Sequence, residues 1–193
     1  VTGVQTCALP ICSGAGSIPV ILLNGGPGCD DYLSPIAEML EDKARIVRFE
    51  PRGTGRSDWD GCYDLATAVT DIDKVRQHYQ FDRVILIGHS FGPNLGLAYC
   101  LSHPQHVTGL IGLAGGKVVD DRSWSDTYHR NKEEIGEDMG GLTFHADSRL
   151  NKELNESWKT YCRQPQTLKN LSELSIPVHF INAGNDIRPN WPT

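Results

Sequence analysis

The sequence predicts an α/β fold in which a mostly parallel sheet carries helices on both faces. Short apolar runs alternate with amphipathic stretches along the chain, an order typical of parallel sheets. The runs are apolar at every position rather than at alternate ones, which indicates strands that are buried on both faces. The expected strands lie at residues 18–23, 44–49, 83–87, 107–113 and 178–183.

Helices are expected between these strands, at residues 32–40, 65–79 and 94–101. The second helix has one apolar face, made by residues that recur at helical spacing: Val69, Ile72, Val75 and Tyr79. Thr67 or Thr70 is expected to cap this helix, because a side-chain hydroxyl can accept a bond from a free backbone N–H.

A polar stretch at residues 117–169 interrupts the alternation. A structureless connection of this length would lie far outside the usual range of loop lengths. We therefore expect a helical insertion, with helices near 125–137 and 149–162, that covers the strand ends as a cap. The core of the fold is then expected to comprise residues 12–116 and 170–193.

Residues 1–11 carry no charge and show no periodicity. They resemble the in-frame translation of a sequencing adapter, and we leave them out of the predicted fold as one would a cloning scar. The native N-terminus is therefore expected to be missing from this sequence. A short disordered or strand-like native leader is the alternative.

The charge and composition of the chain disfavour several classes of partner. The formal net charge is -6, which argues against binding to nucleic acid or anionic membranes. No apolar run approaches the roughly 20 residues that span a bilayer, and no signal peptide is recognisable. The six cysteines form neither a C-x-x-C pair nor a zinc-binding spacing. We expect a cytoplasmic protein with reduced thiols, no metal and no cofactor.

Ser90 is the candidate nucleophile. It lies in Gly88-His89-Ser90-Phe91-Gly92, between an apolar strand and a helix. A Gly-x-Ser-x-Gly turn in this context predicts a nucleophile elbow, which holds the serine hydroxyl exposed at the C-terminal end of the strand. The alternative is a Gly-rich turn without a catalytic role.

Four segments carry a family resemblance: Asn24-Gly25-Gly26-Pro27-Gly28, Arg52-Gly53-Thr54-Gly55-Arg56-Ser57, Gly88-His89-Ser90-Phe91-Gly92 and Ala183-Gly184-Asn185-Asp186. In this order they resemble the α/β-hydrolases, and most of all the proline iminopeptidase branch. The resemblance implies an α/β-hydrolase fold with a catalytic triad. Two positions depart from the peptidase pattern. Asn24 stands where those peptidases usually have His, and their elbow usually reads Gly-Gly-Ser-Trp-Gly.

Three further positions are expected to serve catalysis. Acyl transfer creates an oxyanion that backbone N–H groups must stabilise, and the N–H of Phe91 is one candidate. The Gly25-Gly26 segment can supply the second, with Gly26 favoured by the resemblance, although a plain turn is the alternative. The resemblance also implies that Asp186 is the acid of the triad. A solvent-exposed or turn-capping Asp is the other interpretation.

The base of the triad has no candidate in the sequence. The seven histidines all precede Asp186: His78, His89, His103, His106, His129, His145 and His179. In α/β-hydrolases the order is Ser, acid, His. We therefore expect the histidine beyond Thr193, roughly 25 to 30 residues past Asp186. The chain is then expected to be truncated at both ends and inactive on its own.

The cap is expected to select the substrate. In aminopeptidase relatives, cap carboxylates bind the free amino group of the substrate, which makes acidic residues candidates here: Glu133, Glu134, Glu137 and Asp138. A solvated acidic helix face is the alternative. The aromatic residues of the cap can line an apolar pocket or form a small core of their own: Trp124, Tyr128, Trp158 and Tyr161.

These observations predict a serine hydrolase that acts on a small ester, amide or N-terminal peptide bond. Its partner is a small-molecule or short-peptide substrate. A carboxylesterase, or a non-catalytic binding protein on the same scaffold, are the alternatives. The Arg52 segment is expected to be structural, with Arg52 or Asp58 making buried polar contacts beside the elbow.

Overall fold

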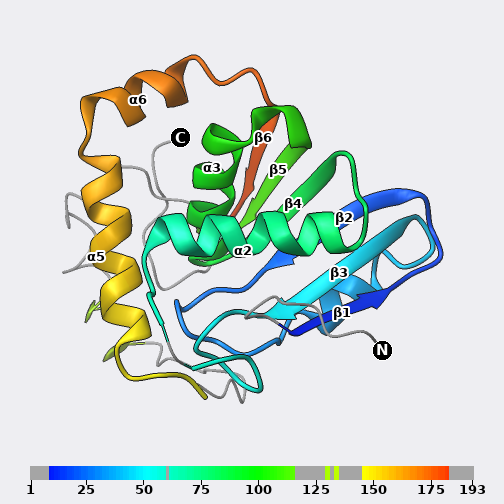
Figure 1. Ribbon diagram of the computed structural model, residues 1–193, viewed down its shortest axis with the longest axis horizontal. Coiled ribbons are helices and arrows are strands. Elements are labelled where there is room, and N and C mark those ends of the chain that lie inside the picture. Colours follow the sequence, from blue (N-terminus) through cyan, green and yellow to red (C-terminus); the bar gives the residue numbers. More distant parts are fainter. Residues whose placement is uncertain (1–8, 60, 116–128, 131–132, 135–144, 183–193) are drawn as a thin grey trace.

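A six-stranded sheet forms the centre of the computed structural model, which describes residues 9–59, 61–115, 129–130, 133–134 and 145–182 (Figure 1). The strands are β1 (Leu9–Ser13), β2 (Ile18–Leu23), β3 (Ala44–Glu50), β4 (Val84–His89), β5 (Val107–Leu113) and β6 (Val178–Ile181). Their order across the sheet is β1-β3-β2-β4-β5-β6. All neighbouring strands are parallel except β1 and β3. The predicted α/β fold with a mostly parallel sheet is confirmed.

Helices lie on both faces of this sheet. They are α1 (Ser34–Glu38), α2 (Leu65–His78), α3 (Gly92–Ser102), α5 (Leu150–Cys162) and α6 (Pro165–Ser172), with a 3-10 turn at Pro104–His106. Figure 1 shows α2 crossing in front of the sheet and α5 standing beside it. In β2, Ile21 and Leu23 are buried in the cluster with α2 and α3, whereas Val20 and Leu22 are buried in the cluster with α1. This two-sided burial explains why β2 is apolar at nearly every position.

Strand β1 includes residues 9–11, which the adapter-like composition places outside the predicted fold. Its residues pair antiparallel with β3, from Leu9 opposite Glu50 to Ser13 opposite Ile46. A strand ladder is made by backbone groups, so a segment within reach can pair with an open sheet edge whatever its side chains. The fold therefore begins earlier than the sequence predicts.

Helix α2 begins one residue after Asp64, which caps it. The Asp64 carboxylate accepts a bond of 2.7 Å from the backbone N–H of Thr67. The prediction that Thr67 or Thr70 caps this helix is therefore wrong. Both threonines lie inside the helix, and the Thr70 hydroxyl donates to the carbonyl of Ala66. A cap residue needs extended backbone angles just before the first turn, and Asp64 has them, with φ −83° and ψ 166°.

Helix α5 agrees with the helix expected at residues 149–162, but its packing differs from that of a separate cap. Leu154, Trp158 and Cys162 are buried in the same cluster as α2 and α3. The ring of Trp158 contacts that of Phe91 edge to face, with centroids 6.5 Å apart. Trp158 is therefore part of the main core and not of a core private to the insertion. Helix α6, which the sequence did not indicate, is only 8 residues long and begins at Pro165.

Candidate active site

Ser90 lies in a tight turn between β4 and α3. Its φ is +57°, a left-handed value that residues with a side chain rarely adopt. Its backbone N–H donates to the carbonyl of Leu113 at the end of β5, over 2.9 Å. A Cβ added at Gly88 would lie 2.4 Å from the carbonyl carbon of Gly92, and one at Gly92 would lie 2.2 Å from the carbonyl oxygen of Leu23. The turn thus requires glycine on both sides of the serine, as a nucleophile elbow does.

The Gly-rich loop after β2 lies directly against this elbow. Parallel pairing places Leu23 opposite Gly88, so the loop begins where the elbow begins. A Cβ added at Gly25 would lie 2.7 Å from the Cβ of Ser90. Gly26 has a φ of +111° and precedes Pro27 through a cis peptide bond. The structure therefore brings Gly25 and Ser90 together, as the sequence predicts.

Phe91 follows Ser90 and is the last residue before α3. Its N–H group therefore lies at the N-terminal end of an 11-residue helix, where the helix dipole favours negative charge. The Phe91 ring is buried. A backbone donor next to the serine and a glycine loop facing it form the arrangement that an oxyanion hole needs.

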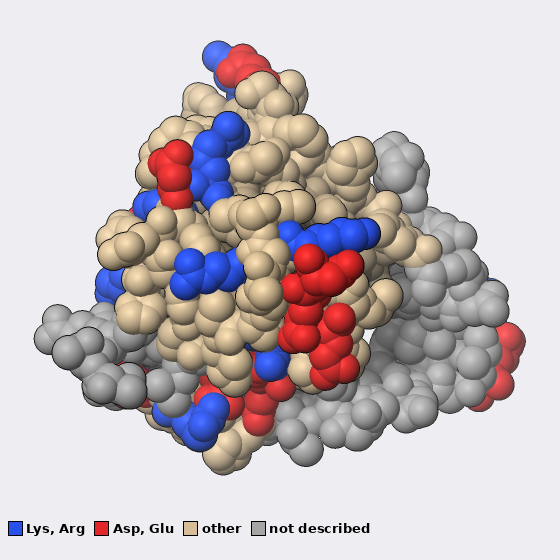
Figure 2. Space-filling model, turned by 90° about the vertical axis from the view of Figure 1, so that its right-hand side faces the viewer, with Lys and Arg blue, Asp and Glu red and all other residues tan. Residues whose placement is uncertain are grey.

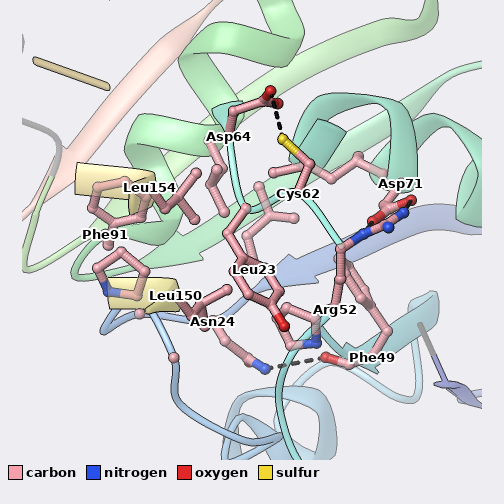
Figure 3. Close-up of a pocket in the computed structure, with 18 residues that line it drawn as sticks. Leu23, Asn24, Phe49, Arg52, Cys62, Asp64, Asp71, Phe91, Leu150 and Leu154 are labelled. Carbon is pink, nitrogen blue, oxygen red and sulfur yellow. Dashed lines mark hydrogen bonds and ion pairs between the residues drawn. The ribbon is translucent and has the colours of Figure 1, made fainter. Parts of the chain in front are cut away.

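Asn24 fixes the start of the Gly-rich loop. Its side chain is buried, and its amide donates to the carbonyl of Phe49 at the end of β3, over 3.1 Å (Figure 3). This residue stands where the related peptidases usually have His. In this chain it ties the loop to the neighbouring strand.

Tyr32 joins the loop to the elbow through hydrogen bonds that sequence reasoning missed. Its hydroxyl oxygen accepts a bond of 3.0 Å from the backbone N–H of Gly25. The same oxygen lies 2.5 Å from Nδ1 of His89, and the two rings meet edge to face. The His89 ring, one residue before Ser90, is therefore engaged with Tyr32. No periodicity or motif in the sequence marks Tyr32, because the contact joins residues 57 positions apart.

A narrow cavity of about 40 Å³ lies beside the loop and the elbow. Gly25, Pro27 and Phe91 contribute to its wall, and Leu150 and Leu154 of α5 close it (Figure 3). The cavity is far smaller than the roughly 300–1,000 Å³ of typical ligand pockets. It therefore accommodates a small apolar group at most. Ser90 is not among the residues that line it.

Arg52 and Asp71 form a bidentate ion pair on the side of this cavity opposite Phe91 and Leu154 (Figure 3). The guanidinium donates from Nε and from a terminal nitrogen to the two carboxylate oxygens, over 2.9 and 3.0 Å. The Asp71 side chain is only 4 % exposed. The expectation that Arg52 makes a buried polar contact is confirmed. The pair anchors the loop after β3 to helix α2.

The segment at residues 145–151 fastens the insertion to both loops. The backbone N–H of Asp147 donates to the carbonyl of Gly53, and the side-chain amide of Asn151 donates to the carbonyl of Pro27 over 2.8 Å. The hydroxyl of Tyr63 donates to the Asp147 carboxylate over 2.9 Å. Burial raises the pKa of Tyr63, and the bond to the Asp147 carboxylate raises it further. Hydrogen bonds from Arg149 hold the pKa of Asp147 well below its usual value.

The remaining candidate residues lie in the expected cap and after β6, and most of them fall outside the described residues. Glu133 and Glu134 are described and are exposed to solvent. Asp186, Glu137 and Trp124 fall outside the described residues, as do Asp138 and Tyr128. Their proposed roles stay predictions.

Within the described ranges, no three His, Cys, Asp or Glu side chains gather as a metal ion would require. None of the helices described here has the length and apolar character needed to cross a bilayer. Figure 2 shows acidic side chains beside basic ones on the face it presents, rather than a field of one sign.

The chain belongs to the α/β-hydrolase family: residues 18–146 match the family described as alpha/beta hydrolase fold. Within it, the chain is similar to the proline iminopeptidase of Arabidopsis thaliana, with 40% identity over 96 residues, which are 48% of this chain and 25% of that protein. It is 38% identical over 103 residues to the proline iminopeptidase of Neisseria gonorrhoeae, covering 49% and 31% of the two chains. The resemblance stated from the motifs is confirmed. The chain spans a third or less of the length of these two relatives.

Solved structures of the same fold include esterases and a lactonase. An esterase from Thermogutta terrifontis superimposes with a TM-score of 0.68 at 17% identity, over 91% of this chain and 74% of that one. The enol-lactonase from Burkholderia xenovorans gives a TM-score of 0.66 at 12% identity, over 92% and 88%. At these identities the likeness concerns the fold alone.

Proposed function

We propose that the chain carries the nucleophile and the oxyanion hole of a serine hydrolase that cleaves a small ester, amide or N-terminal peptide bond. The observation that carries the proposal is the strained Ser90, with φ +57°, in a turn that a glycine loop approaches to within contact distance. Strained backbone of this kind persists where the surrounding structure holds it, and it gathers at functional sites.

The mechanism uses the residues in defined roles. The Ser90 oxygen attacks the carbonyl carbon of the substrate while a histidine base takes the hydroxyl proton. The N–H groups of Phe91 and Gly26 stabilise the oxyanion that forms. The same histidine then gives its proton to the leaving group, which departs and leaves an acyl-Ser90 that water hydrolyses.

Asp186 is proposed to orient the histidine and to stabilise its charged form. Strands β4 and β6 are parallel members of one sheet, so the C-terminal end of β6 lies at the same edge of the sheet as Ser90. The direction of β6 supports this proposal. The mechanism also requires a histidine as its base.

Two substrate classes compete. The sequence similarity to proline iminopeptidases favours cleavage of an N-terminal prolyl bond. The departures at Asn24 and in the elbow weaken the peptidase interpretation, because they replace residues usual in the peptidases, and they leave a carboxylesterase as the alternative.

A fluorophosphonate probe tests the nucleophile directly. The full-length protein that contains this chain is expected to be labelled, and Ser90→Ala is expected to abolish the labelling. Ser172→Ala is the matched control, since the Ser172 hydroxyl bonds only locally, to the carbonyl of Lys169 at the surface of α6. A folded full-length protein that takes no label would contradict the proposal and support the non-catalytic binding protein.

Two chromogenic substrates then separate the classes. We expect hydrolysis of a proline arylamide by the full-length protein if the peptidase interpretation is correct. Hydrolysis of a short-chain p-nitrophenyl ester without any cleavage of the arylamide would overturn it in favour of the carboxylesterase.

A further inference from the structure

We infer that Tyr32 is a positioning residue, which holds the Gly-rich loop after β2 against the nucleophile elbow through His89. This loop, residues 24–28, is the proposed oxyanion loop. The inference rests on the proposed function and adds to it a residue that does not touch the reacting atoms. Its basis is the three-part contact of the Gly25 N–H, the Tyr32 hydroxyl and His89 Nδ1, with separations of 3.0 and 2.5 Å.

The geometry places Tyr32 between two parts of the site that must keep their separation. A Cβ added at Gly25 would lie 2.8 Å from the Tyr32 oxygen and 2.7 Å from the Cβ of Ser90. The loop backbone at Gly25 therefore lies close to both the tyrosine hydroxyl and the nucleophile residue, with no room for a side chain beside them. His89 immediately precedes Ser90, so a bond to its ring connects the loop to the strand that carries the nucleophile.

The chemistry of the hydroxyl suits this role. A phenol has one proton to donate and lone pairs to accept. By accepting from the Gly25 N–H, it orients that peptide, and the following peptide carries the N–H of Gly26. In the tautomer with an unprotonated Nδ1, the phenol proton is donated to His89. Oxyanion donors act through exact placement, and removing one costs about 10²–10³ in kcat. Loosening the loop without removing a donor should cost less.

The experiment compares Tyr32→Phe with wild type in the full-length protein, on whichever chromogenic substrate the wild type cleaves. The ring and its packing stay, and only the hydroxyl is lost. We expect kcat to fall about 10-fold, below the loss for a deleted donor, with KM changed less than about 2-fold. The rate of fluorophosphonate labelling should fall in parallel. Tyr79→Phe is the matched control, since Tyr79 is also half-buried but stacks on Phe81 at the far end of α2.

A second pair of variants addresses the His89 side of the contact. His89→Ala should reproduce the loss in kcat, whereas His89→Asn, whose side-chain oxygen can take the place of Nδ1 as acceptor, should restore much of it. A purely structural role would lower the melting temperature without this split between the two variants. It would also leave kcat per folded molecule unchanged.

The outcomes separate this inference from the proposed function. If the wild type is labelled at Ser90 and Tyr32→Phe keeps its kcat within 2-fold, the inference is overturned and the proposed function stands. A rise in KM with constant kcat would also overturn it, because it would mean that Tyr32 contacts the substrate. If the wild type takes no label at all, both fail together.

Discussion

Gly25 and Ser90 face each other so closely that no side chain fits between them. A Cβ at Gly25 would lie 2.7 Å from the Cβ of Ser90 and 2.9 Å from the carbonyl oxygen of His89. Gly25 follows β2 and Ser90 follows β4, and these two strands are neighbours in the sheet. The sheet register thus sets the distance between the candidate oxyanion loop and the candidate nucleophile.

Gly25→Ala should therefore disable the site. The added methyl group must push the loop away from Ser90, which displaces the proposed oxyanion donor. The rate of fluorophosphonate labelling of the full-length protein should fall about 100-fold, the scale of a lost oxyanion donor. Gly109→Ala is the control, because the nearest atom to a Cβ there is 3.5 Å away. Equal labelling rates for the two variants would contradict the assignment.

Much of the fold was predictable because local pattern and tertiary structure agree. The apolar runs became β2 to β6, and the turn around Ser90 has the strain that its glycines suggested. The contacts that position the loop were not predictable. The bond of Tyr32 to His89 and that of Asn151 to Pro27 join distant segments, and no spacing in the sequence encodes such a meeting. The prediction that Thr67 or Thr70 caps α2 was wrong for a different reason. Asp64 and the two threonines are all good capping residues, and only the backbone angles distinguish them.

Removing the carboxylate of Asp71 should destabilise the fold. Asp71→Ala would remove both bonds between this carboxylate and the Arg52 guanidinium, which is 16% exposed. Breaking a fully buried pair costs about 3–5 kcal/mol. Because Arg52 is partly exposed, we expect a smaller loss for this pair, about 2–3 kcal/mol. The measurement is urea unfolding. Glu173→Ala provides the comparison, since its pair with Lys169 is 64% exposed on both sides and should be worth less than about 0.5 kcal/mol.

Asp73 should make the stability of the fold depend on acid pH. Burial alone would raise the pKa of Asp73, but bonds from Arg76, Tyr99 and Gln77 outweigh it, so the pKa lies below its usual value. A lowered folded-state pKa contributes stability above the unfolded pKa, about 3.9, and this contribution is lost as the pH falls through the folded value.

Asp73→Asn should thus reduce the amount by which the free energy of unfolding falls between about pH 4 and pH 2. Chemical denaturation at a series of pH values measures it. Asp42→Asn, at an exposed position, is the control and should keep the wild-type slope. An unchanged acid slope in Asp73→Asn would show that the pKa of Asp73 does not differ between the folded and unfolded states.

Cys29 should report on opening of the Gly-rich loop after β2, the proposed oxyanion loop. It follows Gly28, is only 3% exposed, and its sulfur would lie 3.3 Å from a Cβ at Gly26. Burial, with a smaller contribution from Asp30, raises the pKa of Cys29 to about 11. At pH 8, about one thiol in a thousand is then a thiolate, the form that reacts. In the closed structure, Cys29 should react with iodoacetamide far more slowly than Cys62, which is exposed.

Gly25→Ala should speed the alkylation of Cys29 while leaving that of Cys62 unchanged, because the added methyl group displaces the loop that covers the first thiol and not the second. Mass spectrometry of the alkylated peptides over time gives both rates in one sample, so Cys62 serves as the internal standard. Gly109→Ala should change neither rate. If Cys29 in Gly25→Ala stays as protected as in the wild type, the loop has absorbed the methyl group without opening, and the predicted loss of labelling at Ser90 would need another cause.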